Sequence, residues 1–292
     1  MSTLNFDPKI FAMSALDAFV AKIAPLNAFS RSYSSEAVNR GSAIAVPRMD
    51  AVVATTFNQS YIGSGGTANT ITVNLNQHRI STVDLTDVQR ANSGLNPSQF
   101  AKQQGEGLAK IVLQDIWSVI TTVNFGAAVL TTAGANYSKT SVRAFRKALA
   151  ESDVDMDNLS LFLGTAEYDA LLSDSNLSQA FQFGGNSVIR DADIARVLGF
   201  NVYESNIIPL NSISLIAFAC HPDAIAVAFR ALDEYIPDGE YLANDVVTHE
   251  SGISLGYRLV YDKTTGKTHS NFECLFGYAA GLTPGLKLAT KP

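Results

Sequence analysis

The acidic stretch DVDMDN, residues 153–158, is the clearest candidate for metal chemistry in this sequence. Carboxylates at alternate positions are the ligands with which a calcium-binding loop begins. Such a loop also needs Gly at its sixth position and Glu at its twelfth, where this chain has Asn158 and Gly164. The stretch is therefore predicted to be a solvated acidic turn.

Histidine and glycine motifs give no better site. His249-Glu250 lacks the second histidine of a zinc-protease motif, because position 253 is Ile. The sequence GSGG, residues 63–66, is followed neither by Gly-Lys-Ser/Thr nor by a helix pattern, so it predicts a flexible hairpin tip rather than a phosphate-binding loop. The four histidines are scattered without metal-ligand spacing: His78, His221, His249 and His269. We predict no metal and no cofactor.

The stretch GFNVYESNIIP, residues 199–209, places a carboxylate, a hydroxyl and an amide in a row at 204–206. Glu204 as a general acid or base would need a second credible group nearby, and no spacing dictates one. Cys220 and Cys274 lie in apolar, strand-like runs without a CxxC motif, which indicates buried free thiols. We assign no catalytic residue, although an α+β enzyme that uses Glu204 or a cysteine stays open as an alternative.

Composition points to a chain that buries much of its surface against other molecules. Only 16% of the residues are charged and 47% are hydrophobic, whereas about 25% of residues are charged in ordinary domains. The net charge is −6 and no Lys/Arg run occurs, so capture of nucleic acid by its phosphates is not indicated. The longest apolar stretch, 212–229, is interrupted by His-Pro-Asp and is too broken to span a membrane. No signal peptide is expected either, and we therefore expect a cytoplasmic origin.

The first half of the chain alternates helical and strand patterns. Apolar residues at three- and four-residue steps predict a helix over 9–24. Residues 43–90 are poor in charge and read as two long strands joined by the tip 62–70. A two-stranded hairpin is marginal alone, so this one should lean on a neighbour. A helix then begins after Asn96 and runs to about Phe125, on the order of 40 Å, with Gly105 and Gly107 weakening its start.

The second half reads as a compact α+β block followed by a hairpin. Expected helices cover 141–152, capped by Ser138 or Thr140, then 165–173, capped by Thr165, and 189–199, ended by Gly199. Expected strands are 159–164, the stretch after Gly199, and 212–220. Alternation in Leu255–Tyr261 and Phe272–Phe276 around the turn 262–267 predicts the closing hairpin.

This order of elements resembles that of the major capsid proteins of tailed bacteriophages, which share the HK97-type fold. The resemblance covers the chain from about residue 40 to its end. It is carried by SVIRDADIARVLGFNVYESNIIP, by HPDAIAVAFR at 221–230, and by GISLGYRLVYDKTTGKTHSNFECLFGYAAG at 252–281. These stretches match packing and turns rather than catalysis.

The resemblance implies an α+β, HK97-like architecture with named parts. These would be an N-terminal arm (1–42), an extended loop or E-loop hairpin (43–90), a peripheral domain with the long spine helix (91–128), a compact axial domain (129–243), and a closing β-hairpin that completes the peripheral domain (244–292). The candidate subunit-interface residues are Tyr61, Ile62, Gly65, Gly66, Ile71, Val73, Glu204 and Asn206.

The implied function is a virion protein, made in the host cytoplasm, that self-assembles from hexamers and pentamers into an icosahedral shell around the phage genome. Expected partners are further copies, a separate scaffolding protein, a portal, and DNA held only non-specifically, with a decoration protein as an open possibility. In some relatives an E-loop lysine forms a covalent isopeptide bond with an Asn of another subunit. No lysine occurs between Lys22 and Lys102 here, so that covalent link is not expected. An encapsulin-type nanocompartment shell is the alternative within the same fold.

Overall fold

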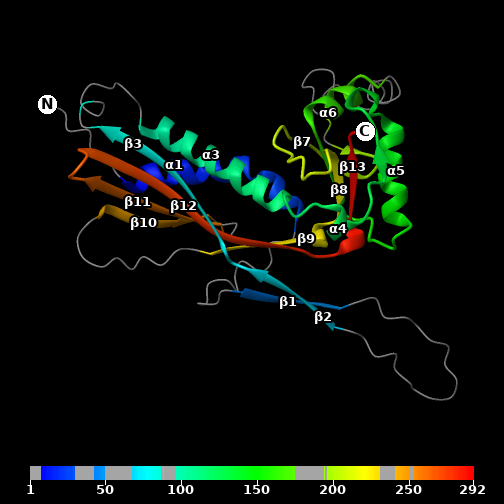
Figure 1. The fold of residues 1–292 in the computed structure, drawn as a ribbon, viewed down its shortest axis with the longest axis horizontal. Helices are drawn as coiled ribbons and strands as arrows, with labels where there is room; N and C mark the ends of the chain where they lie inside the picture. The colour runs from blue at the N-terminus through cyan, green and yellow to red at the C-terminus, as the bar shows by residue number, and fades with distance from the viewer. Residues whose placement is uncertain are drawn as a thin grey trace, which may run out of the picture.

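The computed structural model describes residues 8–29, 43–49, 68–86, 88, 97–174, 194, 196–230, 241–249 and 253–292. Figure 1 shows two lobes and a projecting ribbon. One lobe is a five-stranded sheet with two helices, α1 and α3, along one face, and the other is a six-stranded sheet with α5 and α6. The ribbon is formed by β1 (Ala43–Met49) and β2 (Ala68–Asn74) and lies below the five-stranded sheet in this view.

The five-stranded sheet is built around its longest strand, β12. Its order is β10-β11-β12-β3, and β9 pairs with the C-terminal part of β12. All pairs are antiparallel. The strands are β3 (Gln77–Thr86), β9 (Ile225–Arg230), β10 (Tyr241–Thr248), β11 (Ser254–Asp262) and β12 (Lys267–Ala280). The predicted closing hairpin is present as β11 and β12.

The turn of this hairpin is held by Asp262. Its carboxylate accepts hydrogen bonds from the Thr265 hydroxyl at 2.6 Å and from the Thr264 backbone N–H at 2.8 Å. The Thr265 hydrogen bond, followed by that from Thr264, lowers the pKa of Asp262. Gly266 adopts φ +65°, the left-handed conformation that glycine accepts without strain.

Helices α1 (Pro8–Lys22) and α3 (Pro97–Trp117) cover one face of this sheet. Their apolar sides are buried, with Phe19 in α1 and Leu108 and Val112 in α3 fully enclosed. The two helices cross closely at Gly105, where an added Cβ would lie 2.3 Å from the Ala15 carbonyl oxygen. The glycine that the sequence predicted as a weak point is therefore the position that lets α1 approach α3.

The crossing predicts opposite effects for two glycines of one helix. We expect Gly105→Ala to destabilise the subunit by about 1–3 kcal/mol, because the new methyl group must displace the α1 backbone. A Cβ added at Gly107 would meet no neighbouring atom within 4 Å, so Gly107→Ala should stabilise the helix by up to about 1 kcal/mol. Denaturant unfolding of both variants measures the difference, and equal shifts would contradict the close crossing.

The long helix ends at Trp117, earlier than the predicted end near Phe125. The side-chain amide of Asn211 donates to the carbonyl oxygens of Trp117 at 2.7 Å and Ile120 at 2.8 Å, so a loop from the other lobe binds the C-terminal carbonyls. Thr121 then caps the short helix α4 (Thr122–Phe125) by accepting the Asn124 N–H. With 21 residues, α3 is about 32 Å long rather than about 40 Å.

The six-stranded sheet has the order β4-β13-β8-β5-β7-β6. Most pairs are antiparallel, while β5 runs parallel to β7 and β13 parallel to β4. The strands are β4 (Leu130–Thr131), β5 (Ser160–Leu163), β6 (Arg196–Val197), β7 (Phe200–Glu204), β8 (Leu215–Cys220) and β13 (Leu286–Thr290). Short 3-10 segments complete the described elements: η1 (Ala24–Ala28), η3 (Gly134–Asn136), η4 (Pro222–Ala224) and η5 (Thr283–Gly285).

Helices α5 (Lys139–Ala150) and α6 (Thr165–Leu172) pack their apolar sides into a core on one face of this sheet. Ser138 is the N-cap of α5, as one of the two predicted possibilities had it, and its backbone N–H donates to Ser141 Oγ. Gly164, not Thr165, occupies the N-cap of α6. The opposite face carries an aromatic cluster around Phe162, which joins the core of the first lobe.

The helix predicted over 189–199 is wrong where the structure describes it. Arg196 and Val197 form strand β6, which pairs antiparallel with β7. Leu198 at φ +48° and Gly199 at φ +92° make the two-residue turn between them, and positive φ at both positions is the geometry of a tight hairpin turn. Gly199 therefore reverses the chain instead of ending a helix, while residues 189–193 and 195 lie outside the described part.

Two strands belong to sheets other than those implied by the predicted boundaries. Strand β9 lies within the predicted range 129–243 but pairs with β12 of the five-stranded sheet. Strand β13 lies within the range 244–292 but pairs with β8 and β4 of the six-stranded sheet. The chain therefore crosses between the lobes after β8 and again after β12, which ties the two lobes together.

Candidate assembly interface

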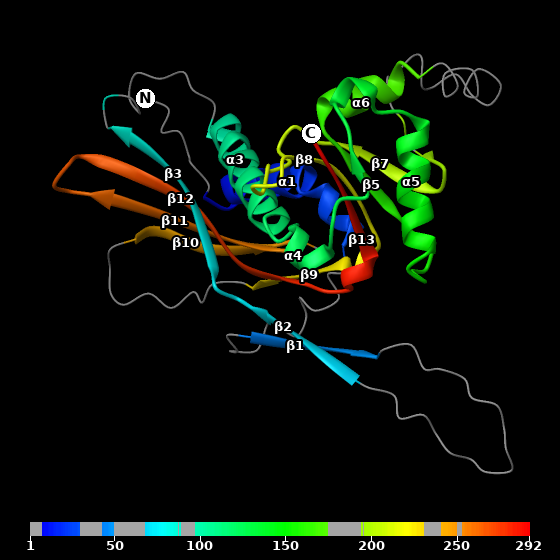
Figure 2. The same cartoon turned by 45° about the vertical axis from the view of Figure 1, so that its right-hand side comes forward.

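The ribbon formed by β1 (Ala43–Met49) and β2 (Ala68–Asn74) is the part of the molecule that projects furthest from its own cores (Figures 1 and 2). The strands pair antiparallel from Ala43 opposite Asn74 to Met49 opposite Ala68. The segment that joins them, 50–67, lies outside the described residues. Four of the candidate interface residues fall in it, and their prediction stays untested: Tyr61, Ile62, Gly65 and Gly66.

The base of the ribbon packs on small side chains of the five-stranded sheet. Ile44, Val73 and Leu75 are buried against Ala226 and Ala228 of β9. Small and large residues alternate along β9. Its larger residues, Ile225, Val227 and Phe229, enter the main core on the other face of the sheet. We call Ala226, Ala228, Gly277 and Ala279 the small-residue patch, which gives the ribbon a flat surface on which to lie.

This packing changes the interpretation of two candidate interface residues. Val73 is completely buried, so in this conformation it belongs to the core of its own subunit and cannot touch a neighbour. Ile71 is half-buried beside the same cluster. In the sequence, Ile71, Val73 and Leu75 alternate with polar residues, which is the pattern of a half-buried strand. That pattern could not show that the covering surface is the chain's own β9.

Gly277 is the closest point between the ribbon and the sheet. A Cβ added there would lie 2.2 Å from the carbonyl oxygen of Asn74. Strand β2 ends at Asn74, and the chain re-enters the five-stranded sheet as β3 at Gln77. Gly277 thus lets the backbone cross β12 at the point where the ribbon leaves the sheet.

We expect Gly277→Val to detach the ribbon base from the sheet. The side chain has no room unless the Asn74 backbone moves, so the variant should lose about 1–3 kcal/mol of stability and form fewer large particles. Leu275→Val, on the same face of β12 two residues earlier, is the matched control and should behave like the unchanged chain. Urea unfolding together with electron microscopy measures both effects; an unchanged Gly277→Val protein would refute the close crossing.

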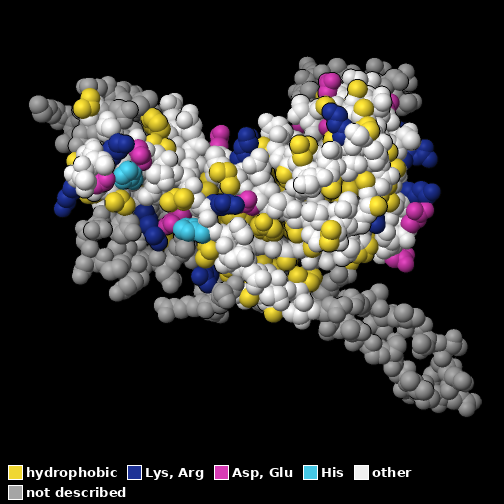
Figure 3. Space-filling model, in the orientation of Figure 1, with side chains coloured by type: hydrophobic (Ala, Val, Ile, Leu, Met, Phe, Trp, Pro, Cys, Tyr) yellow, Lys and Arg dark blue, Asp and Glu magenta, His cyan; other side chains and the backbone are white. Residues whose placement is uncertain are grey.

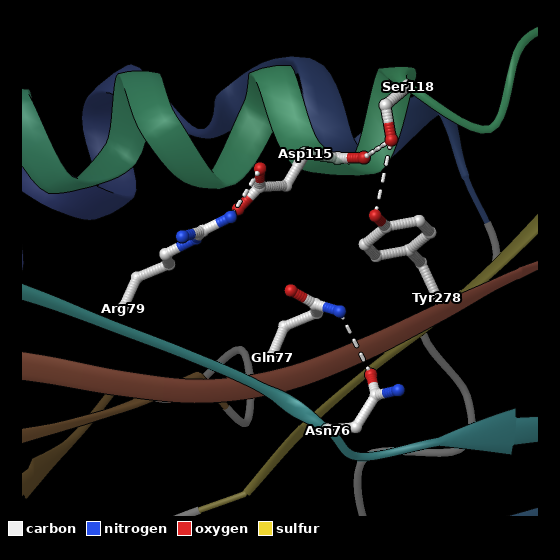
Figure 4. Close-up of polar contacts among 6 residues, drawn as sticks. All are labelled: Asn76, Gln77, Arg79, Asp115, Ser118 and Tyr278. Carbon is white, nitrogen blue, oxygen red and sulfur yellow. Dashed lines mark hydrogen bonds and ion pairs between the residues drawn. The ribbon is translucent and has the colours of Figure 1, made fainter.

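Polar contacts connect this crossing to the end of helix α3 (Figure 4). Arg79 of β3 binds Asp115 of α3 through two hydrogen bonds, at 2.6 Å from Nε and 3.0 Å from Nη2. The hydrogen bond to Asp115 is the main cause that raises the pKa of Arg79. Ser118 Oγ lies 3.2 Å from the Tyr278 hydroxyl. The helix end, β3 and β12 are therefore joined beside the ribbon base.

A buried carboxylate fastens three strands on the face that carries the ribbon. Only 3% of the Glu273 side chain is exposed, and its two oxygens lie 2.9 Å from His78 Nε2 and 2.7 Å from Arg258 Nε. Gly256 leaves room for it, since a Cβ there would lie 2.9 Å from Glu273 Cγ. A buried carboxylate needs charged or hydrogen-bonding partners, and the strands on either side of β12 supply them: Arg258 from β11 and His78 from β3.

Glu204 and Asn206 lie at the exposed end of β7, on the other lobe. Ser205 between them is engaged in the turn: its N–H donates to the Leu163 carbonyl at 2.9 Å and its hydroxyl accepts the Ile207 N–H at 3.3 Å. The row therefore ends a strand and begins a turn. Glu204 and Asn206 are far from the ribbon along the chain, and their interface role remains a prediction.

The structure places the other chemical candidates in ordinary positions. Both cysteines are free and buried, and burial raises the pKa of each thiol. In the acidic stretch, Asp155 accepts the Asp157 N–H and Asn158 turns the chain at φ +54°. Within the described ranges, no group of three or more His, Cys, Asp or Glu residues could hold a metal ion. None of the helices that the structure describes is long and apolar enough to cross a membrane.

Known proteins match this chain by structure and not by sequence. No family model and no curated protein matches it. A chain of Mycobacterium phage Che8 matches with a TM-score of 0.66 at 16% identity over 91% of this chain and 90% of that one. The capsid structure of the cyanophage P-SCSP1u gives 0.61 at 14% identity over 86% and 84%. A virus-like particle from Pyrococcus furiosus gives 0.57 at 11% identity over 96% and 98%. The chain has the HK97-type capsid fold.

The HK97-type fold extends over nearly the whole chain, since the three matches cover 86–96% of this chain and 84–98% of the matched chains. At 11–16% identity, what the proteins share is the arrangement of elements rather than particular side chains. The α+β class and the fold expected from the sequence are therefore confirmed.

This HK97-type subunit exposes large apolar side chains that the sequence patterns did not identify. Ile111 and Val123, apolar residues within the helix predicted to run to about Phe125, are 41% and 91% exposed. Met13, on the apolar stripe of α1, is 51% exposed. The low charged fraction was the available signal, because it predicted surface covered by other molecules. The exposed apolar set is Met13, Ile80, Val88, Ile111, Val123, Leu210 and Leu242.

Proposed function

We propose that this chain is the major capsid protein of a tailed bacteriophage, which assembles from hexamers and pentamers into an icosahedral shell around the genome. The observation that carries the proposal is the near full-length match to the cyanophage capsid structure and to the phage Che8 chain. The projecting ribbon and the exposed apolar side chains support it, because both offer contact area to other copies.

In this proposal the E-loop is the hairpin 43–90, whose ribbon base is fixed on its own subunit while its outer part reaches a neighbour. The fixed base, with Val73 buried and Gly277 under Asn74, supports this division of roles. Residues 1–42 act as the N-terminal arm, although α1 packs closely on α3. The peripheral and axial domains correspond to the five-stranded and six-stranded lobes.

The further partners follow from the same proposal. A separate scaffolding protein directs assembly, a portal occupies one vertex, a decoration protein is an optional addition, and DNA is enclosed without specific contacts. The net charge of −6 supports the last point, since an acidic inner surface would repel phosphates weakly. The protein would be made in the host cytoplasm and reside in the virion.

A second candidate is an encapsulin-type nanocompartment shell. The virus-like particle from Pyrococcus furiosus is compatible with it, since that chain matches over 96% of this one and 98% of its own length. Its TM-score of 0.57 is lower than the 0.66 of the phage Che8 chain. Neighbouring genes for a terminase and portal, as opposed to a cargo enzyme, distinguish the two candidates.

Electron microscopy of the purified, expressed chain tests the proposal. We expect hollow shells with fivefold vertices when the scaffolding partner is supplied, and a cargo protein inside if the nanocompartment candidate is correct. A chain that stays monomeric with its partners, or that turns over a substrate, would refute a shell function.

A further inference from the structure

Helix α5 carries a concentration of positive charge that is unusual for this acidic chain. Arg143, Arg146 and Lys147 are exposed and Lys139 is half-buried, and all four lie on one side of the helix. The opposite side is apolar and buried, with Val142, Phe145 and Leu149 in the core of the lobe. We call these four cationic residues the basic face.

Four acidic residues follow the basic face along the chain, with a total charge equal and opposite to it. Glu151, Asp153, Asp155 and Asp157 are all exposed in the segment after the helix, which we call the acidic turn. Val154 is buried and fixes the turn to its own lobe. Figure 3 shows dark-blue side chains above magenta ones along the right-hand edge, over α5 of Figure 1. The two groups carry four charges each, of opposite sign.

The positions of these charges along α5 do not stabilise the helix. Helices are stabilised by anions at the N-terminus and cations at the C-terminus, whereas the acidic turn follows the C-terminus of α5. The backbone at the start of α5 is already satisfied, because the Lys139 N–H donates to Asp174 Oδ2 at 2.9 Å. The charges therefore call for a partner outside the helix.

Pairing within the chain uses little of this charge. Lys147 Nζ lies 3.6 Å from Glu151 Oε1, but both side chains are largely exposed, and such pairs contribute little. Arg143 forms no hydrogen bond or ion pair with any residue in the described ranges. Arg146 donates to the Leu198 carbonyl, and this contact holds its guanidinium in place beside the β6–β7 turn.

The basic face borders a groove that could receive a protruding segment. The groove has a volume of about 550 Å³ and is lined by the four cations together with Ala150 and Leu198. Its lining combines cationic heads with aliphatic stems. The exposed carboxylates of the acidic turn, residues 151–157, match the cationic heads of this lining.

We propose that the groove on α5 receives the acidic turn of a second copy of this chain. The same contact, repeated from each copy to the next, closes successive copies into a ring. The inference rests on the proposed shell function and names the contact that builds its rings. Equal and opposite patches on one chain suit a head-to-tail contact, and head-to-tail contacts that close make rings. A nucleic acid is a poorer occupant, because the adjacent acidic turn would repel its phosphates.

Charge reversal with restoration tests the contact on the full chain. Arg143→Glu with Lys147→Glu reverses the basic face, and Glu151→Lys with Asp157→Lys reverses the acidic turn; neither pair includes Arg146 or the left-handed Asp153 (φ +52°). Each double variant should lower the assembled fraction at least about tenfold at low salt, since like charges then face each other. The quadruple variant should restore rings and shells.

The matched control for the basic-face pair reverses two exposed lysines of α3 with Lys102→Glu and Lys110→Glu, which change the net charge by the same amount and in the same direction as that pair. Circular dichroism confirms folding, while sedimentation and electron microscopy count rings and shells. Double variants that assemble normally would overturn the inference, and so would a quadruple variant that stays unassembled. If the unchanged chain forms no shells when its scaffolding partner is supplied, the proposed function itself fails. If shells form in every variant, only this contact is refuted.

Discussion

Deletion of the hairpin tip, residues 62–70, is expected to leave folded subunits that no longer assemble into shells. The deletion removes three residues of β2 and their pairing with Pro47, Arg48 and Met49. It leaves the ribbon base, where Val73 and Leu75 are buried against β9. Folding should therefore be retained, while the outer part of the hairpin, which we propose contacts the neighbour, is lost.

The subunit and the shell are measured separately. Thermal unfolding of the isolated subunit should shift by about 4 °C or less, the change that about 1 kcal/mol produces in a chain of this size class. Sedimentation and electron microscopy should show loss of large particles. A chain in which nine Gly/Ser residues replace 62–70 keeps the length and controls for reach. Normal capsids from the deletion would count against the proposal that the outer part of the hairpin contacts a neighbouring subunit.

Elements with local patterns were predictable from the sequence. The helix near the N-terminus, the strand at 159–164 and the closing hairpin all appear, since periodicity and turn residues are properties of neighbouring positions. The end of α3 was not predictable, because Asn211 binds its last carbonyls from 94 residues away along the chain. Strand β6 was missed for a similar reason, since its partner β7 decides its conformation.

The candidate interface shows the same limit. Alternation placed Val73 on the buried side of a strand, but the surface that covers it is formed by Ala226 and Ala228, more than 150 residues later. Gly277 was visible as a glycine, while its contact with the Asn74 carbonyl depends on two strands crossing. A signal was present in IAVAFR at 225–230, where small and large residues alternate: small residues face the ribbon and large ones the core.

A continuous set of contacts connects the ribbon base to the second lobe. The ribbon base contacts β9 and β12, and Arg79 beside it binds Asp115 near the end of α3. Trp117, the last residue of the same helix, enters the aromatic cluster on the six-stranded sheet. The ribbon base and the second lobe are therefore joined through packed and hydrogen-bonded contacts.

Phe162→Ala should be the most destabilising single substitution in this cluster. Phe162 is fully buried and stacks on Phe218 at a centroid distance of 4.8 Å and on Tyr203 at 5.0 Å. It also contacts Phe29 of the N-terminal region at 5.8 Å and Trp117 of α3 at 5.6 Å. Removal of the ring leaves a cavity among four aromatic side chains and should cost about 3–5 kcal/mol, out of a total stability of about 5–15 kcal/mol.

Two further substitutions separate packing from other effects. Phe162→Leu keeps most of the volume and should cost less than Phe162→Ala, because the lost contacts and the cavity are smaller. Val123→Ala removes an apolar side chain that is 91% exposed and should change the free energy of unfolding by no more than about 0.5 kcal/mol. Denaturant unfolding of the unassembled subunits ranks the three variants. Phe162 projects from the six-stranded sheet toward η1 and α3, so its loss should also loosen the junction of the lobes and reduce assembly. A Phe162→Ala subunit as stable as Val123→Ala would show that the two lobes are held together elsewhere.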